Sequence, residues 1–201
     1  MKKLIVLTSF FLCLSMQSYG QLKLTINGFV DNNNESNDYV VANFENISQD
    51  RLYADVLKFI NKSYKSPKDV INEVKPEMIT ISGFQPSCIS LTKVKSFLGN
   101  KTSLTGGFDM QYNISVQIKD GKIRMDAPTF ECTQNNSGRI TRLVMTGSNG
   151  GLGTEVRTAL FKKDGKPSRE NAISMIEDCF NTFFNEMVKY INDSNSAKSD
   201  W

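Results

Sequence analysis

The chain has 201 residues, of which 39% are hydrophobic and 22% are charged, as in ordinary globular proteins. It contains no histidine, which excludes Ser-His-Asp and Cys-His catalysis and removes the commonest metal ligand. The 24 basic residues barely outnumber the 21 acidic ones, so the charge gives no support for nucleic-acid binding. We therefore expect a protein that is not an enzyme and has no catalytic residues, metal or cofactor.

The first twenty residues have the pattern of a secretory signal peptide. Two lysines precede an apolar run from Leu4 to Leu14, and small residues then lead to a cleavage between Gly20 and Gln21. The run is shorter than the roughly 20 residues that a membrane-spanning helix needs. Its removal leaves 22 basic and 21 acidic residues. We expect an exported protein, periplasmic or secreted, with residues 1–20 removed and no transmembrane span.

The exported part keeps three cysteines, Cys88, Cys132 and Cys179. This number is too small for a disulfide scaffold and is odd for an oxidising compartment. None of the three has the spacing of a redox motif or a histidine partner. We expect structural roles, with one disulfide and one buried thiol, and the spacing leaves the pairing open.

The organisation along the chain is simple. Residues 21–38 are predicted to form an N-terminal strand near Leu22 to Val30, followed by a flexible polar linker without apolar residues. Residues 39–193 are predicted to form a single domain, and residues 194–201 a disordered tail.

The first half of this domain is predicted to alternate strands and helices. Residues 39–44 form a strand, and apolar residues at helical spacing then predict a helix from Ser48 to Tyr64, with Ser48 as its N-cap. Ser66-Pro67 starts a short helical turn. A strand over residues 78–83 places Ile79 and Ile81 on one face.

The strongest signal is a hairpin around Asp120-Gly121, a dipeptide typical of a tight type I′ turn. This turn pairs Lys119 with Lys122, and continuing the register places Ile114 opposite Ala127. The apolar side chains then share one face, and Gln117 and Arg124 lie on the opposite, wet face. Pro128 is expected to interrupt the register, which leaves the directions of Phe130 and Cys132 open.

The second half is predicted to end in a long helix over the sheet. Strands near residues 139–146 and 154–161 flank the glycine-rich loop 147–153, which is interpreted as a hairpin loop. A helix capped by Ser168 follows, with an apolar stripe. The stripe contains Ile173, Ile176, Phe180, Phe183, Met187 and Ile191. The fold class is α+β: a curved antiparallel sheet with one face covered by an N-terminal helix and the long C-terminal helix.

Several segments match this layout and also resemble a known family. They are Ser48-Gln-Asp-Arg-Leu-Tyr-Ala54, Ser66-Pro-Lys-Asp-Val-Ile71, Met78-Ile-Thr-Ile-Ser-Gly83 and Ile114-Ser-Val-Gln-Ile-Lys-Asp-Gly-Lys-Ile-Arg-Met-Asp126. Over residues 40–132 the chain resembles exported bacterial domains of unknown function with a TATA-binding-protein-like fold. The resemblance implies a curved antiparallel sheet with helices and supplies no catalytic residue. It does not imply DNA binding, because fold and function separate easily. The chain differs from the pattern at residues 84–107 and after residue 139.

Isolated motifs give little support for catalysis. Ser90 and Lys93 have the Ser-x-x-Lys spacing but lack the companion motifs of that enzyme class. Asp126 and Glu131 fall on opposite faces of one strand unless Pro128 intervenes. The basic residues between Lys162 and Arg169 are interpreted as a solvated loop.

Two kinds of binding function therefore remain. The leading hypothesis is a binding domain in the cell envelope that contacts a protein or another macromolecule through the wet sheet face, including Gln117 and Arg124, or through residues 84–107. The alternative is a carrier of an apolar small molecule between the last helix and the sheet, where Phe180, Phe183 and Phe184 lie on the helix.

Overall fold

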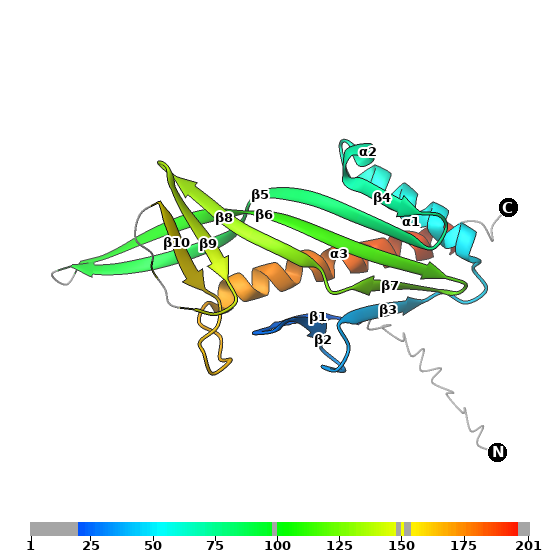
Figure 1. The fold of residues 1–201 in the computed structure, drawn as a ribbon. Coiled ribbons are helices and arrows are strands. Elements are labelled where there is room, and N and C mark those ends of the chain that lie inside the picture. Colours follow the sequence, from blue (N-terminus) through cyan, green and yellow to red (C-terminus); the bar gives the residue numbers. More distant parts are fainter. Residues whose placement is uncertain (1–19, 98–99, 148–149, 151–153, 197–201) are drawn as a thin grey trace, which may run out of the picture.

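The computed structural model describes residues 20–97, 100–147, 150 and 154–196. Helices α1 and α3 pack against one face of a large sheet, and a small hairpin lies beside α3 (Figure 1). The predicted signal peptide lies outside the described residues, apart from Gly20. No helix in the described part of the chain is long and apolar enough to cross a membrane.

The elements have the following bounds. The N-terminal hairpin consists of β1 (Leu22–Thr25) and β2 (Gly28–Asp31). The large sheet consists of β3 (Tyr39–Asn43), β4 (Ile71–Val74), β5 (Met78–Phe97), β6 (Asn100–Lys119), β7 (Lys122–Asp126), β8 (Thr129–Asn136), β9 (Arg139–Val144) and β10 (Glu155–Ala159). The helices are α1 (Gln49–Ser63), α2 (Pro67–Val70) and α3 (Glu170–Ser196).

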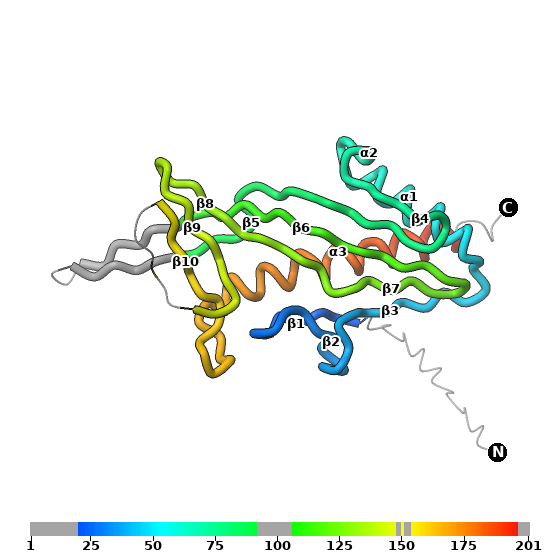
Figure 2. The backbone as a smooth tube through the Cα atoms, in the orientation of Figure 1, coloured from blue at the N-terminus to red at the C-terminus, as the bar shows by residue number. Residues whose placement is uncertain are grey.

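Strand β6 is the axis of the sheet. It pairs with β5 on one side, and on its other side it pairs first with β8 and then with β7. Strands β7 and β8 thus form one interrupted strand along β6 (Figure 2). Beyond them, β3 pairs with β7, and β9 pairs with β8.

The predicted hairpin register is confirmed, since Lys119 pairs with Lys122 and Val116 with Met125. The turn type was predicted wrongly: Gly121 has a φ of 70°, whereas Asp120 does not have a positive φ. A type I′ turn needs positive φ at both positions.

Pro128 interrupts the register as expected. The pairing resumes with Asn113 opposite Thr129, so one extra residue has entered the β7–β8 strand and the predicted pairing of Ile114 with Ala127 does not form. This bulge turns Cys132, which is fully buried, and Phe130, which is half-buried, toward the inner face.

The core lies between this inner face and the helices. Helix α1 buries Leu52, Val56 and Ile60. In α3 the predicted stripe is correct except at one position: Phe184 is fully buried, and Phe183 instead packs against Phe59 of α1, with ring centroids 5.5 Å apart.

Four predictions of element bounds need correction. The expected strand over residues 22–30 is a hairpin, and residues 31–38 form hydrogen-bonded turns. Strands β9 and β10 pair in parallel, so residues 147–153 do not form a hairpin loop between them. The predicted cap Ser168 lies two residues before Glu170, the first residue of α3. Helix α3 also continues to Ser196, past the expected domain end at residue 193.

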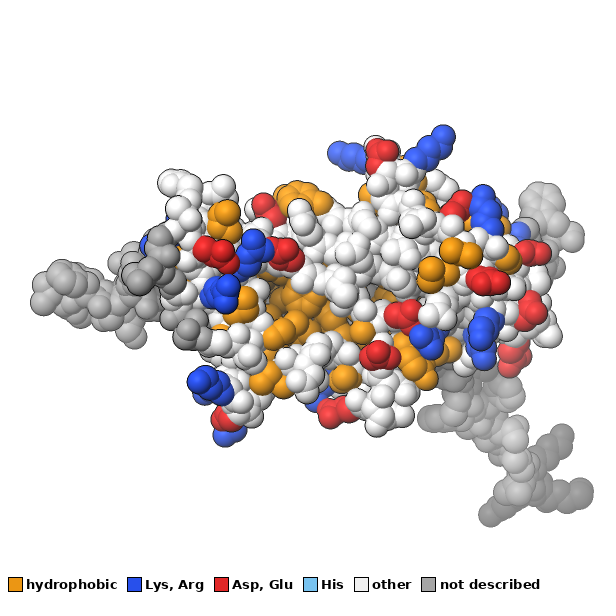
Figure 3. All heavy atoms as spheres, viewed as in Figure 1, with side chains coloured by type: hydrophobic (Ala, Val, Ile, Leu, Met, Phe, Trp, Pro, Cys, Tyr) orange, Lys and Arg blue, Asp and Glu red, His pale blue; other side chains and the backbone are white. Residues whose placement is uncertain are grey.

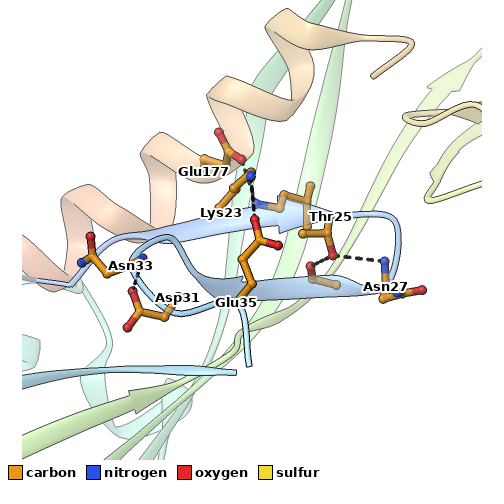
Figure 4. Close-up of polar contacts among 9 residues, drawn as sticks. Lys23, Thr25, Asn27, Asp31, Asn33, Glu35 and Glu177 are labelled. Carbon is orange, nitrogen blue, oxygen red and sulfur yellow. Dashed lines mark hydrogen bonds and ion pairs between the residues drawn. The ribbon is translucent and has the colours of Figure 1, made fainter. Parts of the chain in front are cut away.

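The N-terminal hairpin is attached to α3 by side chains. The amide of Asn181 accepts a hydrogen bond from Leu22 N (2.8 Å) and donates one to Leu22 O (2.9 Å), and Glu177 accepts one from Leu24 N (2.7 Å). Lys23 also pairs with Glu35 across the hairpin (Figure 4). The backbone edge of β1 is therefore paired with a helix instead of with a strand.

Candidate binding site at an open sheet edge

The five residues predicted as a ligand or partner face lie on opposite sides of the sheet. Phe180 and Phe184 are buried in the core, and Phe183 contacts α1. Gln117 and Arg124 pair with each other on the wet face. The structure therefore does not bring these two groups together into one site.

On the wet face, Gln117 and Arg124 are engaged with a neighbouring carboxylate. Asp126 accepts hydrogen bonds from Gln117 Nε2 (2.9 Å) and Arg124 Nε (2.6 Å), and the Arg124 guanidinium lies 4.3 Å from the ring centroid of Tyr39. A depression of about 270 Å³ lies here between β3, β7 and β6. Most of the residues that line it are polar or charged, and its arginine is already paired.

The possible carboxylate pair Asp126 and Glu131 is also engaged in ion pairs. Met125 and Cys132 are buried on the inner face, so the Pro128 bulge puts both carboxylates on the outer face. Each forms an ion pair there, Asp126 with Arg124 and Glu131 with Arg142. General acid–base catalysis by two carboxylates needs one of them protonated and the other free, and these pairings favour neither state.

The remaining predicted motifs do not assemble a site among the described residues. Ser90 Oγ lies 3.6 Å from Met175 Sδ, and the side chain of Lys93 is outside the described part. Gly150 forms a bridge with Arg157, while most of the glycine-rich loop is not described. The basic loop is an exposed turn in which Lys166 pairs with Asp164. The described residues also contain no group of three or more acidic or cysteine side chains that could hold a metal ion.

One segment of the sheet edge has no strand partner in the described structure. Strand β3 pairs with β7 up to Asp126, and β9 pairs with β8 only from Thr133 onward. Between them, residues 129–132 pair with β6 on one side alone. The pairing of β9 with β8 ends at Arg142, while β9 continues to Val144 paired with β10 on its other edge. The sheet is therefore open at this edge.

A cluster of aromatic rings lies beneath the open edge. Phe130 of β8 contacts Phe29 of β2 and Phe180 of α3, with ring centroids 5.8 and 6.1 Å apart. Phe180 also contacts Tyr112 of β6, whose hydroxyl hydrogen-bonds at 2.9 Å with that of Tyr64, the residue that follows α1. Burial raises the pKa of both tyrosines, so both hydroxyls stay neutral. Apolar and neutral groups from four elements thus meet at one place.

The space-filling view shows that the apolar surface is exposed here. Hydrophobic side chains gather in a hollow between β8 and β9 on one side and the β1–β2 hairpin on the other, with α3 running behind (Figures 1 and 3). Phe130 is half-buried and its ring contacts join β8, β2 and α3, which places it at this hollow. Charged side chains lie around the rim (Figure 3).

Sequence reasoning missed this hollow. It found Phe180 as a possible contact with an apolar ligand, but Phe130 was left without a direction because of Pro128. The useful signal was Pro128 itself, since a proline between two paired segments marks an irregular or open strand edge.

The predicted cleavage site lies just before the hairpin. Gln21 directly precedes β1, and its carbonyl accepts a hydrogen bond from Asn32 N at 2.7 Å. A cut between Gly20 and Gln21 would therefore leave all of β1 in place.

Comparisons with known proteins agree with this fold. Residues 39–133 match the model of a family described as a domain of unknown function (DUF4468) with TBP-like fold. None of the curated proteins matches the chain significantly.

Two solved structures also match this chain, at low sequence identity. A TBP-like protein from Parabacteroides distasonis ATCC 8503 is 15% identical, with a TM-score of 0.46 over 75% of this chain and 90% of its own. A DUF4468 family protein from Bacteroides ovatus ATCC 8483 is 14% identical, with a TM-score of 0.42 over 78% of this chain and 79% of its own. The family match thus covers residues 39–133 of this chain, from β3 into β8.

Proposed function

We propose that the protein is an exported, non-enzymatic binding domain and that the hollow at the open edge of β8 binds an apolar ligand. The observation that carries the proposal is the exposed apolar surface itself. Leaving apolar surface in water costs about 25 cal/mol per Å², and apolar patches with a polar rim commonly mark interaction sites.

The hollow favours an apolar small molecule over the macromolecule expected at the wet face. Most residues that line the wet-face depression are polar or charged, including two lysines, and Asp126 already neutralises its Arg124. The second expected surface, residues 84–107, forms the outer parts of β5 and β6. The apolar hollow lies between α3 and the edge of the sheet. Concave apolar surfaces between such elements are typical binding sites for apolar small molecules.

The test compares two phenylalanines on opposite faces of the sheet. Phe130 lies at the hollow, whereas Phe84 pairs with Gln111 on the wet face and is 58% exposed. The protein is titrated with palmitate and with the fluorescent apolar probe anilinonaphthalene sulfonate. Native mass spectrometry of the untreated protein reports any ligand that it carries from the cell.

We expect saturable binding of one probe molecule, and we expect Phe130→Lys to weaken it at least tenfold because a charge enters the apolar hollow. Phe84→Lys should leave binding unchanged. Thermal unfolding verifies that the variants fold, and Phe130→Ser replaces the lysine variant if that variant does not. Absence of probe binding, or equal losses in the Phe130 and Phe84 variants, would overturn the proposal.

A further inference from the structure

The three cysteines of the described chain are free thiols, and two of them meet. Cys88 lies in β5, Cys132 in β8 and Cys179 in the middle of α3. Cys88 and Cys179 are half-buried, and they lie close enough for each thiol to shift the pKa of the other. They come from segments 91 residues apart in the sequence, so the fold brings them together.

An irregularity in β5 positions Cys88 for this contact. The register with β6 shifts between Gln85 and Ile89, and Ser87 within the shift has a φ of 50°. The Ser87 amide donates a hydrogen bond to Asp109 Oδ1 at 2.8 Å, which fixes the bulge. On the helix side, Cys179 Sγ donates to Gln85 Oε1 at 3.4 Å, so Cys179 faces this same bulge.

Cys132 is placed apart from Cys88. It is fully buried in β8, opposite Met110 of β6, and β6 separates β8 from β5. Strands separated by one intervening strand lie about 9–10 Å apart, which exceeds the roughly 7 Å limit between the Cα atoms of a disulfide.

We infer that Cys88 and Cys179 are a disulfide-forming pair that links β5 to α3, and that Cys132 stays a thiol. The oxidant is a low-molecular-weight disulfide such as oxidised glutathione. One thiolate attacks a glutathione sulfur, which breaks the glutathione S–S bond and releases one glutathione thiolate. The other cysteine then attacks the protein–glutathione disulfide and releases the second. Two protein thiols lose two electrons and two protons, and one glutathione disulfide becomes two thiols.

The surroundings indicate which thiol reacts first and how pH controls the rate. Burial raises the pKa of Cys88 to about 11 and that of Cys132 to about 12. Burial and the neighbouring carboxylate of Asp178 also raise the pKa of Cys179, but by less than burial raises that of Cys88, because the nearby Cys88 thiol partly offsets them. Cys179 is therefore the attacking thiol, and the rate should rise about tenfold per pH unit from pH 7 to pH 9 as the thiolate fraction rises.

The experiment uses the full chain with Cys13→Ser, so that only the three described cysteines can react. The reduced protein is incubated with oxidised glutathione, its remaining thiols are alkylated, and its intact mass and non-reduced peptides are measured. We expect the cross-linked protein to be about two daltons lighter before alkylation. We also expect one alkyl group, on Cys132, and a peptide that links Cys88 to Cys179.

Matched variants separate this pairing from the others. Cys132→Ser should form the same cross-link at the same rate, whereas Cys179→Ser should form none and keep glutathione on Cys88. Cys179→Ala replaces the serine variant if that variant does not fold. Alkylation of all three cysteines after oxidation, a stable glutathione adduct on Cys179 without a cross-link, or a linked peptide that contains Cys132 would overturn the inference. The outcome does not depend on ligand binding at the hollow.

Discussion

At the scale of single residues, helix α1 is capped from another part of the chain. Ser48 occupies the N-cap position but makes no side-chain capping bond. Asp120, from the β6–β7 turn, instead accepts a hydrogen bond from Gln49 N at 2.7 Å. Gln49 Nε2 in turn donates to Ile118 O at 2.8 Å. One turn residue thus joins the hairpin to the helix.

We expect Asp120→Ala to lower the free energy of unfolding by about 1 kcal/mol, the usual effect of losing a cap. Ser48→Ala should change it by much less, because only the main-chain oxygen of Ser48 bonds to Leu52 N. Urea unfolding of both variants measures the difference. Asp120→Asn keeps the acceptor oxygen and serves as the control. If Asp120→Ala and Ser48→Ala lowered the free energy of unfolding equally, Asp120 would not be the residue that caps α1.

Glu73 is a residue through which pH should affect stability. It accepts a hydrogen bond from the Tyr53 hydroxyl of α1 and pairs with Lys75 at 3.0 Å. These contacts, that of Tyr53 foremost, lower the pKa of Glu73 from its usual 4.5. A carboxyl whose pKa is lower in the folded state stabilises the fold above its unfolded pKa, and this contribution is lost as the pH falls through the folded pKa.

The native protein should therefore lose more stability below about pH 4.5 than the Glu73→Gln variant, which has no proton to take up there. Urea unfolding midpoints, measured at pH 7 and at steps down to pH 3, show how steeply the stability of each of the two proteins falls with pH. Glu35→Gln is the matched control, because its partner Lys23 lies on the exposed side of the hairpin. Parallel curves for the native and Glu73→Gln proteins would exclude this role.

At the scale of elements, the N-terminal hairpin depends on α3 for its position. Asn181 bonds to both the amide and the carbonyl of Leu22, as a neighbouring strand would. Asn181→Leu removes both hydrogen bonds and leaves two part-buried backbone groups without this partner. Such losses cost about 1–3 kcal/mol.

We expect this cost to appear as faster hydrogen exchange at Leu22 and Leu24, with little change at Ile79 and Ile81 in the centre of the sheet. Asn171→Leu, at an exposed position in the first turn of α3, is the matched control. Unchanged exchange at Leu22 in Asn181→Leu would show that apolar contacts alone hold the hairpin. Since the hairpin borders the hollow, the same variant should also weaken palmitate binding.

At the scale of the whole molecule, local patterns predicted the elements better than their pairing. The Asp120-Gly121 hairpin and the stripe in α3 were predictable because turn geometry and helical periodicity involve neighbouring residues. The parallel pairing of β9 with β10 was not predictable, because it depends on contacts between residues far apart in the sequence and not on a local pattern. The open edge at Phe130 was missed for a related reason, since it depends on where the pairing of β3 with β7 and of β9 with β8 ends.

The Cys88–Cys179 link would act on the whole molecule through its unfolded state. It closes a loop of 91 residues that contains β6 to β10 and the first part of α3. Restricting an unfolded chain over a loop of this length stabilises the folded state by up to about 4–5 kcal/mol. Because Cys179 already faces the β5 bulge that holds Cys88 in the reduced protein, little rearrangement of the folded state should offset this gain.

We therefore expect the oxidised protein to unfold at a temperature several degrees higher than the reduced protein, at about 2–4 °C per kcal/mol for a domain of this size. Differential scanning calorimetry with and without a reductant measures the shift. Cys132→Ser should show the same shift and Cys179→Ser none. A cross-linked protein with an unchanged or lower unfolding temperature would mean that the link strains the contact between the β5 bulge and α3, and that the two sulfurs meet at an unfavourable geometry.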